Sequence, residues 1–582
     1  MPLGNPFMRR NPLVRIVLFA GIFAALPLAA RARGLQEEVT RAFEKSVPLP
    51  AGQSLRVEHK FGNIDVRTAP ERQVHIVAHI HASASSHDQA QRLADGISIQ
   101  VTESTAGVSV RTEYPRTESF FGFRNSSYAV DYEIVMPEAA GLEIQNSFGS
   151  VSVAGLKGDA EIHNRNGALT FRNGRGTQRL ENSFGALEVT GNEGDVTATD
   201  NNASIHAEDV RGSLVIRNRF GGVKAGRIAK STDIQSGNGD VELDDAGAPT
   251  SLTTSFGSVT ASNIHGDLTV HDTNGAVDVR GVAGAADLST SFGSITFFDV
   301  SKELTLTATN SRISGNKVGG RTRAHTTFGS IEISDVGEGL EAEDSNGRIS
   351  VRDIRGPVTV GTRFGEIEGE KITGSASVRD SNGAVHLRDV GGAAEVRNSF
   401  GAVELSAIHG SARVVTGNSS VTVADIEGET YVKTTFGLTR ASRIKGPLTV
   451  ETSNGSVETS EVRGPARIQT SFGAVVLRGV GGAVEVNNQN GSVEASGFEA
   501  KSSGKCNPII LKTSFAPIRV HLPPDGSYSV EAKTSFGRIA SEFPITVSGA
   551  VSGDLVAGKI GDGGCELRLT NSNSSIEILK GP

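Results

Sequence analysis

Residues 254–289 read TSFGSVTASNIHGDLTVH and then DTNGAVDVRGVAGAADLS, two consecutive segments of 18 residues that follow one template. Phe256 stands at position 3 of the first segment and Asn274 at position 3 of the second, and a glycine follows each. Apolar residues recur at positions 6, 8, 11, 15 and 17 of both segments. A repeat of this length with a fixed apolar pattern indicates stacked copies of one structural unit.

The template continues without an insertion over twenty units, from Asn146 to Lys505, and only the last unit is degraded. Position 3 holds Phe and Asn in strict alternation, which we call the Phe/Asn row. The phenylalanines are Phe148, Phe184, Phe220, Phe256, Phe292, Phe328, Phe364, Phe400, Phe436 and Phe472. The asparagines are Asn166, Asn202, Asn238, Asn274, Asn310, Asn346, Asn382, Asn418, Asn454 and Asn490.

Each unit divides into two similar halves of nine residues. Position 4 is Gly after every Phe of the row and after seven of its ten Asn, and position 13 is Gly in 15 of the 20 units. Each half therefore predicts a turn at Gly, where a positive φ is tolerated, followed by a five-residue strand with alternate apolar residues facing inward. Such a strand is buried only when the next unit stacks on it in parallel.

The predicted fold is all-β, a parallel β-solenoid with 18-residue coils and two flattened sheets. A strand spacing of about 4.8 Å makes twenty coils roughly 95 Å long. The general preference for right-handed crossovers favours a right-handed solenoid.

The Phe/Asn row is predicted to be structural. We expect each Phe ring to fill the corner of the core over a height of two coils, while each Asn bonds the turn backbone beside it. On this interpretation Phe292→Ala opens a cavity and costs about 3–5 kcal/mol. Function is then expected on the polar columns around the row or at the ends of the rod.

The first 32 residues are typical of a secretory signal peptide. Three arginines precede an apolar run over residues 16–30, which is short for a membrane span, and Ala30-Arg31-Ala32 fits a cleavage site. An uncleaved anchor is the alternative. Cleavage removes four Arg and no acid, which changes the net charge from -8 to -12, with 53 basic against 65 acidic residues. An acidic exported chain disfavours nucleic acid as a partner.

Both ends of the repeat are predicted to be β-rich caps, because an open solenoid otherwise exposes sheet edges. Residues 33–145 contain a hairpin-like pair around Phe61-Gly62 and one helix between Ser86 and Gly96. Residues 506–582 carry two further Phe turns, at Phe515 and Phe536. The only two cysteines, Cys506 and Cys565, can form a disulfide in an oxidising compartment; two free thiols are the alternative.

The search for chemistry in the sequence yields no catalytic residue, no cofactor site and no metal site. His75, His79 and His81 share one face of a predicted strand, and a solvated strand face is preferred to a metal site because no Cys or acid completes a ligand set nearby. The repeats carry no insertion that could wall a cleft, as polysaccharide lyases with a β-helix require. Exposed aromatic residues, which sugar-binding surfaces use, are expected only at Tyr431 and Phe298, with Phe297 inward.

The segments YEIVMPEAAGLEIQNSFGSVSVAGLKGDAEI (residues 132–162) and GDGGCELRLTNSNSSIEI (residues 561–578) resemble the bacterial putative-adhesin family of β-solenoid (right-handed β-helix) domains of unknown function. The resemblance covers most of the chain after the signal, and its motifs are turn–strand units. It implies an exported, envelope-associated, non-catalytic β-helical protein, and it offers no catalytic residue to carry over.

The sequence thus predicts an exported structural or adhesin-like protein of the periplasm, the outer-membrane surface or the extracellular space. It is expected to bind an envelope or surface partner, protein or polysaccharide, through its polar sheet faces. A carbohydrate-active or carbohydrate-binding β-helix is the alternative, and release of products from a polysaccharide would favour it.

Overall fold

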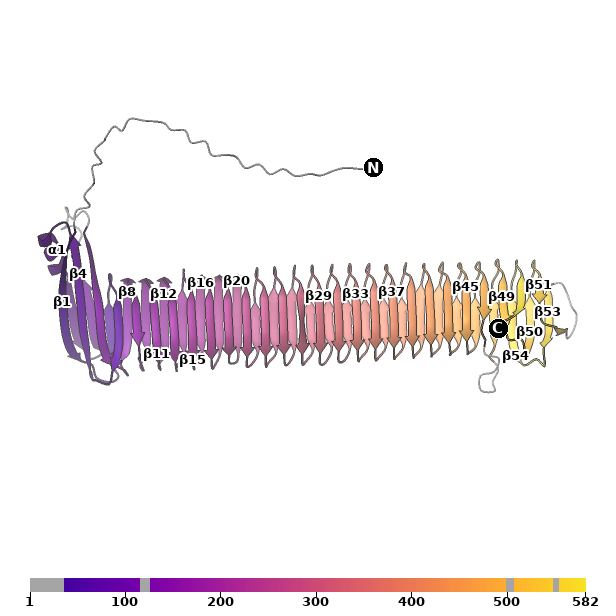
Figure 1. Cartoon of the computed structure of the whole chain (residues 1–582), viewed down its shortest axis with the longest axis horizontal. Coiled ribbons are helices and arrows are strands. Elements are labelled where there is room, and N and C mark those ends of the chain that lie inside the picture. The colour runs from indigo at the N-terminus through magenta and orange to yellow at the C-terminus, as the bar shows by residue number, and fades with distance from the viewer. Residues whose placement is uncertain (1–35, 116–125, 499–506, 548–553, 582) are drawn as a thin grey trace, which may run out of the picture.

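The computed structural model describes residues 36–115, 126–498, 507–547 and 554–581. They form one straight rod of stacked coils with a larger cap at the N-terminal end (Figure 1). The predicted signal peptide, residues 1–32, and Cys506 lie outside the described residues.

The coil has the predicted length. β20 (Thr250–Phe256) pairs in parallel with β22 (Leu268–His271), and β21 (Val259–Ile264) pairs in parallel with β23 (Val277–Val282). In both pairs the partner residues are 18 apart, as in Thr250↔Leu268. The same offset repeats from β8 (Gly141–Phe148) to β47 (Val493–Ser496), so the parallel β-solenoid with 18-residue coils is confirmed.

The apolar columns form the core between the two sheets. In the coil that begins at Thr254, the buried residues at positions 6, 8, 11, 15 and 17 are Val259, Ala261, Ile264, Leu268 and Val270. A four- to seven-residue strand with one apolar face gains burial only against its neighbours. The core is therefore continuous along the rod and its stability comes from contacts between adjacent coils.

A polar column also lies inside, at position 1 of the coil, two residues before the Phe/Asn row. Asn164 donates from Nδ2 to the carbonyl of Gly167 at 3.0 Å, and Thr290 Oγ1 donates to the carbonyl of Gly275 at 3.1 Å. The Asn and Thr side chains donate to turn carbonyls that face the corner of the core, whereas the Asp side chains of the column accept from turn amides, as Asp380 Oδ2 does from the Gly383 amide at 2.6 Å. The column comprises Asn146, Asn164, Asn182, Asp200, Asn218, Ser236, Thr254, Asp272, Thr290, Thr326, Asp344, Thr362, Asp380, Asn398, Thr416, Thr434, Thr452, Thr470 and Asn488, all buried.

Glycine is required at positions 4 and 13 of the coil for different reasons. Gly257, at position 4, has φ +130°, and a Cβ there would lie 2.3 Å from the carbonyl oxygen of Gly239 in the preceding coil. Gly176, at position 13, lies outside the left-handed region, but its Cβ would stand 2.3 Å from the carbonyl oxygen of Gly158. The predicted positive φ is therefore wrong for most of position 13, where the close approach of stacked backbones excludes a side chain.

The N-terminal cap ends both sheets with antiparallel strands. In one sheet β1 (Glu37–Pro48), β4 (Gln73–Ala84) and β7 (Ser127–Pro137) are antiparallel neighbours. β7 then runs parallel to β3 (Ile64–Ala69), which pairs with β9 (Val151–Ala154) of the first coils. The predicted helix is α1 (His87–Asp95), with Ser86 and Gly96 as its caps, and it packs on β4 and β1.

The second sheet begins at β5 (Ser98–Ser104), which is antiparallel to β6 (Gly107–Glu113). β2 (Ser54–Glu58) lies between β6 and β8, parallel to both. The predicted hairpin around Phe61-Gly62 is therefore wrong, because β2 and β3 belong to different sheets. The turn between them is a coil corner of the same kind as those of the repeat.

At the C-terminal end the chain order and the spatial order differ. β48 (Ile509–Lys512) pairs with β54 (Cys565–Thr570), which pairs with β50 (Tyr528–Lys533), so a late strand lies between two earlier ones. β53 (Leu555–Ile560) follows in antiparallel orientation to β50, and the two-residue β52 (Thr546–Val547) pairs antiparallel with β53. In the other sheet β49 (Ile518–Leu522) is followed by β55 (Ile576–Lys580) and β51 (Ile539–Ser541). Cys565 is buried in β54 and is disulfide-bonded, while a pairing with Cys506 stays a prediction.

Candidate functional site

The ten phenylalanines of the Phe/Asn row face solvent. Their exposed fractions run from 43% at Phe220 to 57% at Phe364, whereas Phe297 and Phe171, which do lie in the core, are at most 1% exposed. The expectation that the phenylalanines of the row fill the corner of the core is therefore wrong. The corrected residues are Phe148, Phe184, Phe220, Phe256, Phe292, Phe328, Phe364, Phe400, Phe436 and Phe472.

The rings at position 3 face solvent because of the residue two positions earlier, at position 1. Strict alternation places position 3 on the inward face, together with positions 15, 17 and 1. The polar residue at position 1 instead fills the corner and binds turn backbone, as Asn164 does at the carbonyl of Gly167. The chain closes over this bond, so the ring at position 3 lies on the outer side of the turn.

Seven of the ten asparagines of the row bind backbone through their side chains, as predicted. Asn166 is in register with Phe148 in one coil and with Phe184 in the other, and its Nδ2 donates to the carbonyl of Ser147 at 2.9 Å. The same bond to the residue that precedes the Phe is made by Asn202, Asn238, Asn274, Asn346, Asn382 and Asn490. Successive rings therefore lie two coils apart, about 9.6 Å at ordinary strand spacing.

The C-terminal cap continues this alternation in space although the sequence order breaks. The Asn573 amide donates to the carbonyl of Ser514, which precedes Phe515, and the Phe536 amide donates to the carbonyl of Ser572, which precedes Asn573. The row therefore extends as Phe515, Asn573 and Phe536, with Asn573 supplied by a later part of the chain. Phe515 and Phe536 are 64% and 83% exposed. We call the exposed rings of the row, together with Phe515 and Phe536, the aromatic ridge.

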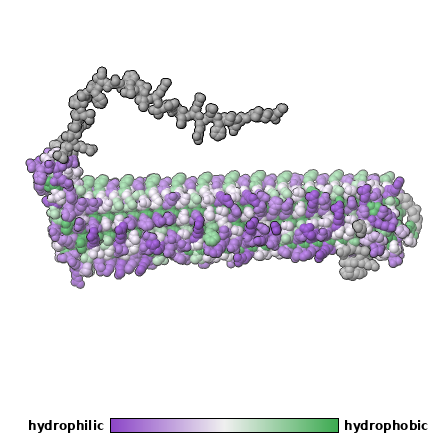
Figure 2. Space-filling view, viewed as in Figure 1, coloured by the Kyte–Doolittle hydropathy of each residue, from purple (hydrophilic) through white to green (hydrophobic). Residues whose placement is uncertain are grey.

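The residues that directly precede the rings are mostly uncharged, although Arg219 places its Cζ 5.3 Å from the centroid of the Phe220 ring. Ser or Thr precedes eight of the ten phenylalanines from Phe148 to Phe472, and Arg219 and Arg363 precede the other two. Figure 2 shows a row of apolar atoms along the upper edge of the rod. Each half-exposed ring leaves on the order of 100 Å² of apolar surface in water. The ten rings together leave about 1,000 Å² of apolar surface, arranged in one line with an Asn between successive rings.

The opposite corner of the coil is charged. Its residues pair between coils, with Arg227 Nε 2.5 Å from Asp209 Oδ1 and Arg443 Nε 2.6 Å from Asp425 Oδ1. The hydrogen bond from Arg227 holds the pKa of the Asp209 carboxyl below its usual value. Asp209 and Arg443 also have positive φ, 59° and 53°, so this corner carries the left-handed turn. The two edges of the rod therefore present opposite chemistry.

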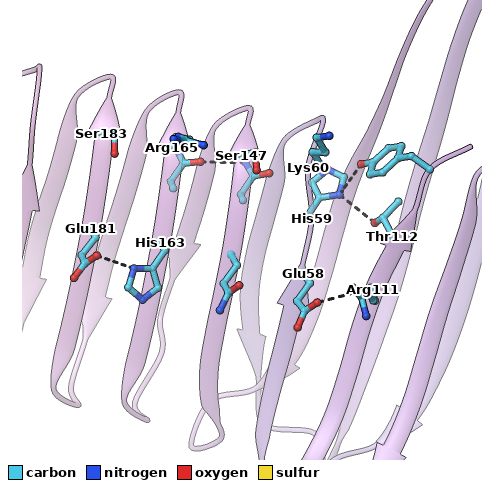
Figure 3. A pocket seen from close by; sticks show the side chains of 14 residues that line it. Glu58, His59, Lys60, Arg111, Thr112, Ser147, His163, Arg165, Glu181 and Ser183 are labelled. Carbon is cyan, nitrogen blue, oxygen red and sulfur yellow. Dashed lines mark hydrogen bonds and ion pairs between the residues drawn. The ribbon is translucent and has the colours of Figure 1, made fainter. Parts of the chain in front are cut away.

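A shallow polar hollow of about 660 Å³ lies beside the N-terminal cap, across strands β2, β6 and β8 and the next two coils (Figure 3). His59 is buried there, with Nδ1 3.1 Å from both Thr112 Oγ1 and Tyr114 Oη. Burial lowers the pKa of His59 to about 4, so its ring is neutral at pH 7. His163 lies between two carboxylates, 2.8 Å from Glu181 and 3.2 Å from Glu161. His59 and His163 thus bind neighbouring strands, and Glu58 pairs with Arg111 at 3.5 Å.

The histidines of β4 lie at the surface, where His75 Nδ1 is 2.9 Å from Ser46 Oγ and His81 Nδ1 is 3.5 Å from Glu38 Oε1. His79 lies between them on the same face of the strand. Within the described ranges, no group of three or more His, Cys, Asp or Glu is placed to hold a metal ion. Among the same residues, no helix has the length and apolar character needed to cross a membrane.

The sequence placed Phe298 outward and Phe297 inward, and the structure agrees, with 47% and 1% exposed. Tyr431 packs under the guanidinium of Arg413, whose Cζ is 4.4 Å from the ring centroid. What the sequence reasoning missed is the aromatic ridge. The run of Asn, Asp, Ser and Thr at position 1 is the signal that could have revealed it, because one corner column cannot accommodate both that run and the rings.

Comparison with known proteins adds little to this geometry. No known family model matches the chain, and no curated protein matches it. Among solved structures, one match is described as a putative cell adhesion protein from Clostridium sporogenes. It is 12% identical, covers 34% of this chain and all of its own, and has a TM-score of 0.17. The resemblance to the putative-adhesin family therefore stays a prediction.

Proposed function

We propose that the chain is an exported, non-catalytic, adhesin-like rod whose aromatic ridge is the surface that contacts an envelope or cell-surface partner. The observation that carries the proposal is the row of half-exposed phenyl rings along one edge. Keeping so much apolar surface in water is unfavourable unless a partner covers it. The sequence favoured the polar sheet faces for this role, but their charges pair with one another between coils, as Lys224 and Glu242 do at 2.8 Å.

The continuity of the row supports a role beyond folding. A solenoid needs no phenylalanine outside its core, yet the alternation of ring and Asn persists through the C-terminal cap with residues drawn out of chain order. A rigid rod keeps those rings at a constant spacing, which suits a long, regular contact. The absence of catalysis remains part of the proposal, and the pairing of His163 with Glu181 and of Glu58 with Arg111 in the polar hollow supports it.

Carbohydrate binding is a second candidate, and the same ridge favours it. The flat faces of aromatic rings provide apolar platforms for sugar rings, and a row at a fixed interval suits a repetitive polysaccharide. The sequence alone offered only Tyr431 and Phe298 for this purpose. A protein partner and a glycan partner would contact the same rings. The two candidates differ in whether the chain binds envelope protein or polysaccharide.

The test compares three forms of the chain on coated beads. The four-ring variant replaces Phe256, Phe292, Phe328 and Phe364 by Asn, the residue that occupies the alternate coils. Phe298→Asn is the matched control, because it removes an exposed ring that lies off the ridge. Beads are incubated with cell-envelope fragments and with a panel of insoluble polysaccharides, and soluble products are assayed.

We expect the four-ring variant to lose at least about tenfold in retention and Phe298→Asn to behave as the unmodified chain. Retention on polysaccharides alone would favour the carbohydrate-binding candidate. Equal retention of all three forms would contradict the role of the ridge. Release of soluble sugar would contradict the non-catalytic assignment.

A further inference from the structure

We propose that the aromatic ridge pairs with the ridge of a second copy of this chain, in antiparallel orientation, so that the rings of one copy insert between the rings of the other. The inference rests on the proposed function, since it names the partner of the same surface. It follows from the spacing of the row, from a ring pair within the chain, from the exposed area and from the shape of the cap.

The spacing of the row leaves room for one ring between two. Consecutive rings are two coils apart, about 9.6 Å, and the intervening Asn is folded back onto the carbonyl of the preceding coil. A ring from a partner placed over that Asn lies about 4.8 Å along the axis from each neighbour. Aromatic pairs favour centroid separations of roughly 4.5–7 Å. A second copy of the row has rings at the same interval of two coils, with space for a ring above each intervening Asn.

The N-terminal end already contains such a pair. Phe61 and Phe148 occupy adjacent coils with no Asn between them, and the two residues form a parallel bridge. Their rings stack with centroids 5.3 Å apart and an interplanar angle of 13°. Rings separated by one coil at this corner can therefore stack, which is the contact that interleaved ridges would repeat.

Area and charge permit a stable pair. Ten rings cover on the order of 1,000 Å² on each copy, about 2,000 Å² in total, within the range of specific interfaces. Ser and Thr precede most of the rings, and the charged residues in the same turns are of both signs, as Arg348 and Glu366 are, so two ridges of an acidic chain meet without a block of like charge. The opposite edge, with charges of both signs at its corner, offers no such apolar surface.

The orientation follows from symmetry and from the cap. A two-fold axis perpendicular to the rod, between a Phe coil and an Asn coil, places each ring of one copy level with an Asn of the other. An axis along the rod would set Phe level with Phe. Such an axis would also bring both N-terminal caps to one end, where the cap rises beyond the edge that carries the ridge (Figures 1 and 2). Antiparallel pairing avoids both conflicts.

The first experiment measures mass by sedimentation equilibrium on the exported chain, the four-ring variant and Phe298→Asn. We expect the chain and Phe298→Asn to be dimers at micromolar concentration and the four-ring variant to associate at least about 100-fold more weakly. Matching circular dichroism and melting curves establish that the variants are folded.

The second experiment fixes the orientation by disulfide cross-linking in the otherwise unchanged chain. Asn346 lies eleven coils from both Phe148 and Phe536, at the centre of the aromatic ridge, and Asn166 lies one coil from its start. In the antiparallel pair the two copies of Asn346 come within about one coil, while the copies of Asn166 are roughly 70 Å or more apart. Asn346→Cys should cross-link on oxidation and Asn166→Cys should not.

Cross-linking of both cysteine variants would contradict antiparallel pairing, and cross-linking of neither, together with a monomer mass, would overturn self-association. If the chain is monomeric but the four-ring variant still loses retention on the beads, the proposed function stands and the partner is another molecule. If the four-ring variant equals the unmodified chain in both bead retention and sedimentation, both proposals fail.

Discussion

At the scale of single residues, one corner of the coil is built from two columns of residues, at positions 1 and 3. The polar side chain at position 1 satisfies the turn from inside, and the ring or Asn at position 3 stands outside. Phe292 and Phe297 make the difference plain, because they are five residues apart in one coil and are 54% and 1% exposed. The sequence contains both columns, but period-two reasoning has no means of telling where the alternation stops.

The corrected prediction for Phe292→Ala is a small loss of stability. Its ring leaves a solvated edge, so the free energy of unfolding should fall by less than about 1 kcal/mol. Phe297→Ala, by contrast, should cost about 3–5 kcal/mol, because it leaves a cavity in the core. Thermal and denaturant unfolding of the two variants compares them directly. Equal and large losses of unfolding free energy in the two variants would indicate that the Phe292 ring is buried in the corner of the core.

Asp272 predicts a measurable pH dependence. Burial raises the pKa of its carboxyl, as it raises the pKa values of Asp200, Asp344 and Asp380 in the same column. A raised folded-state pKa favours the protonated form in the native rod. The contribution of Asp272 to the free energy of unfolding therefore falls as the pH rises from the ordinary Asp pKa of about 3.9 through the raised pKa. Above the raised pKa the contribution is constant.

Asp272→Asn should remove this dependence. Asn is the residue that binds the turn carbonyl at Asn164, so the variant keeps the acceptor and gains a donor. We expect an increase in unfolding free energy at pH 7 of about 0.5–1.5 kcal/mol and a smaller difference between pH 4 and pH 7. Asp209→Asn is the control of opposite sign, since pairing with Arg227 lowers the pKa of Asp209. A lower melting temperature for Asp272→Asn at pH 7 would contradict the assignment.

At the scale of the coil, glycine sets how closely the turns stack. Positions 4 and 13 both place a backbone against the carbonyl of the preceding coil, and position 4 adds a positive φ in many coils. The sequence predicted the turns, the strands, the apolar columns and the 18-residue period, because those depend on local pattern. It missed the strand order of the caps, since β54 lies between β48 and β50 through pairings that no local pattern encodes.

Gly257→Ala should loosen the coil at one place. Its Cβ meets the carbonyl of Gly239 and its φ is strained for any other residue, so we expect a loss of at least about 1–3 kcal/mol. Gly222→Ala is the matched control, because its Cβ has its nearest neighbour 3.6 Å away. Amide hydrogen exchange should rise in the coils next to Gly257 and stay unchanged for Gly222→Ala. Unaltered exchange in both would show that the stacking tolerates a methyl group.

At the scale of the whole molecule, the rod is a rigid support with two unlike edges. One edge carries paired charges and left-handed turns, and the other carries the aromatic ridge from the N-terminal cap to Phe536. On the proposed function, the 36-residue double period serves this surface as well as the fold. A long regular row gives a partner many weak, equivalent contacts, which together decide binding and register.

Hydroxyl-radical labelling with mass spectrometry tests the outward row most directly, because it reports the solvent exposure of each phenylalanine in the intact chain. In dilute solution the rings of the aromatic ridge should be oxidised several-fold faster than Phe171 and Phe297, and raising the protein concentration should protect the ridge selectively. If the ridge rings are as protected as Phe297 at high dilution, the rings are buried and the account is contradicted.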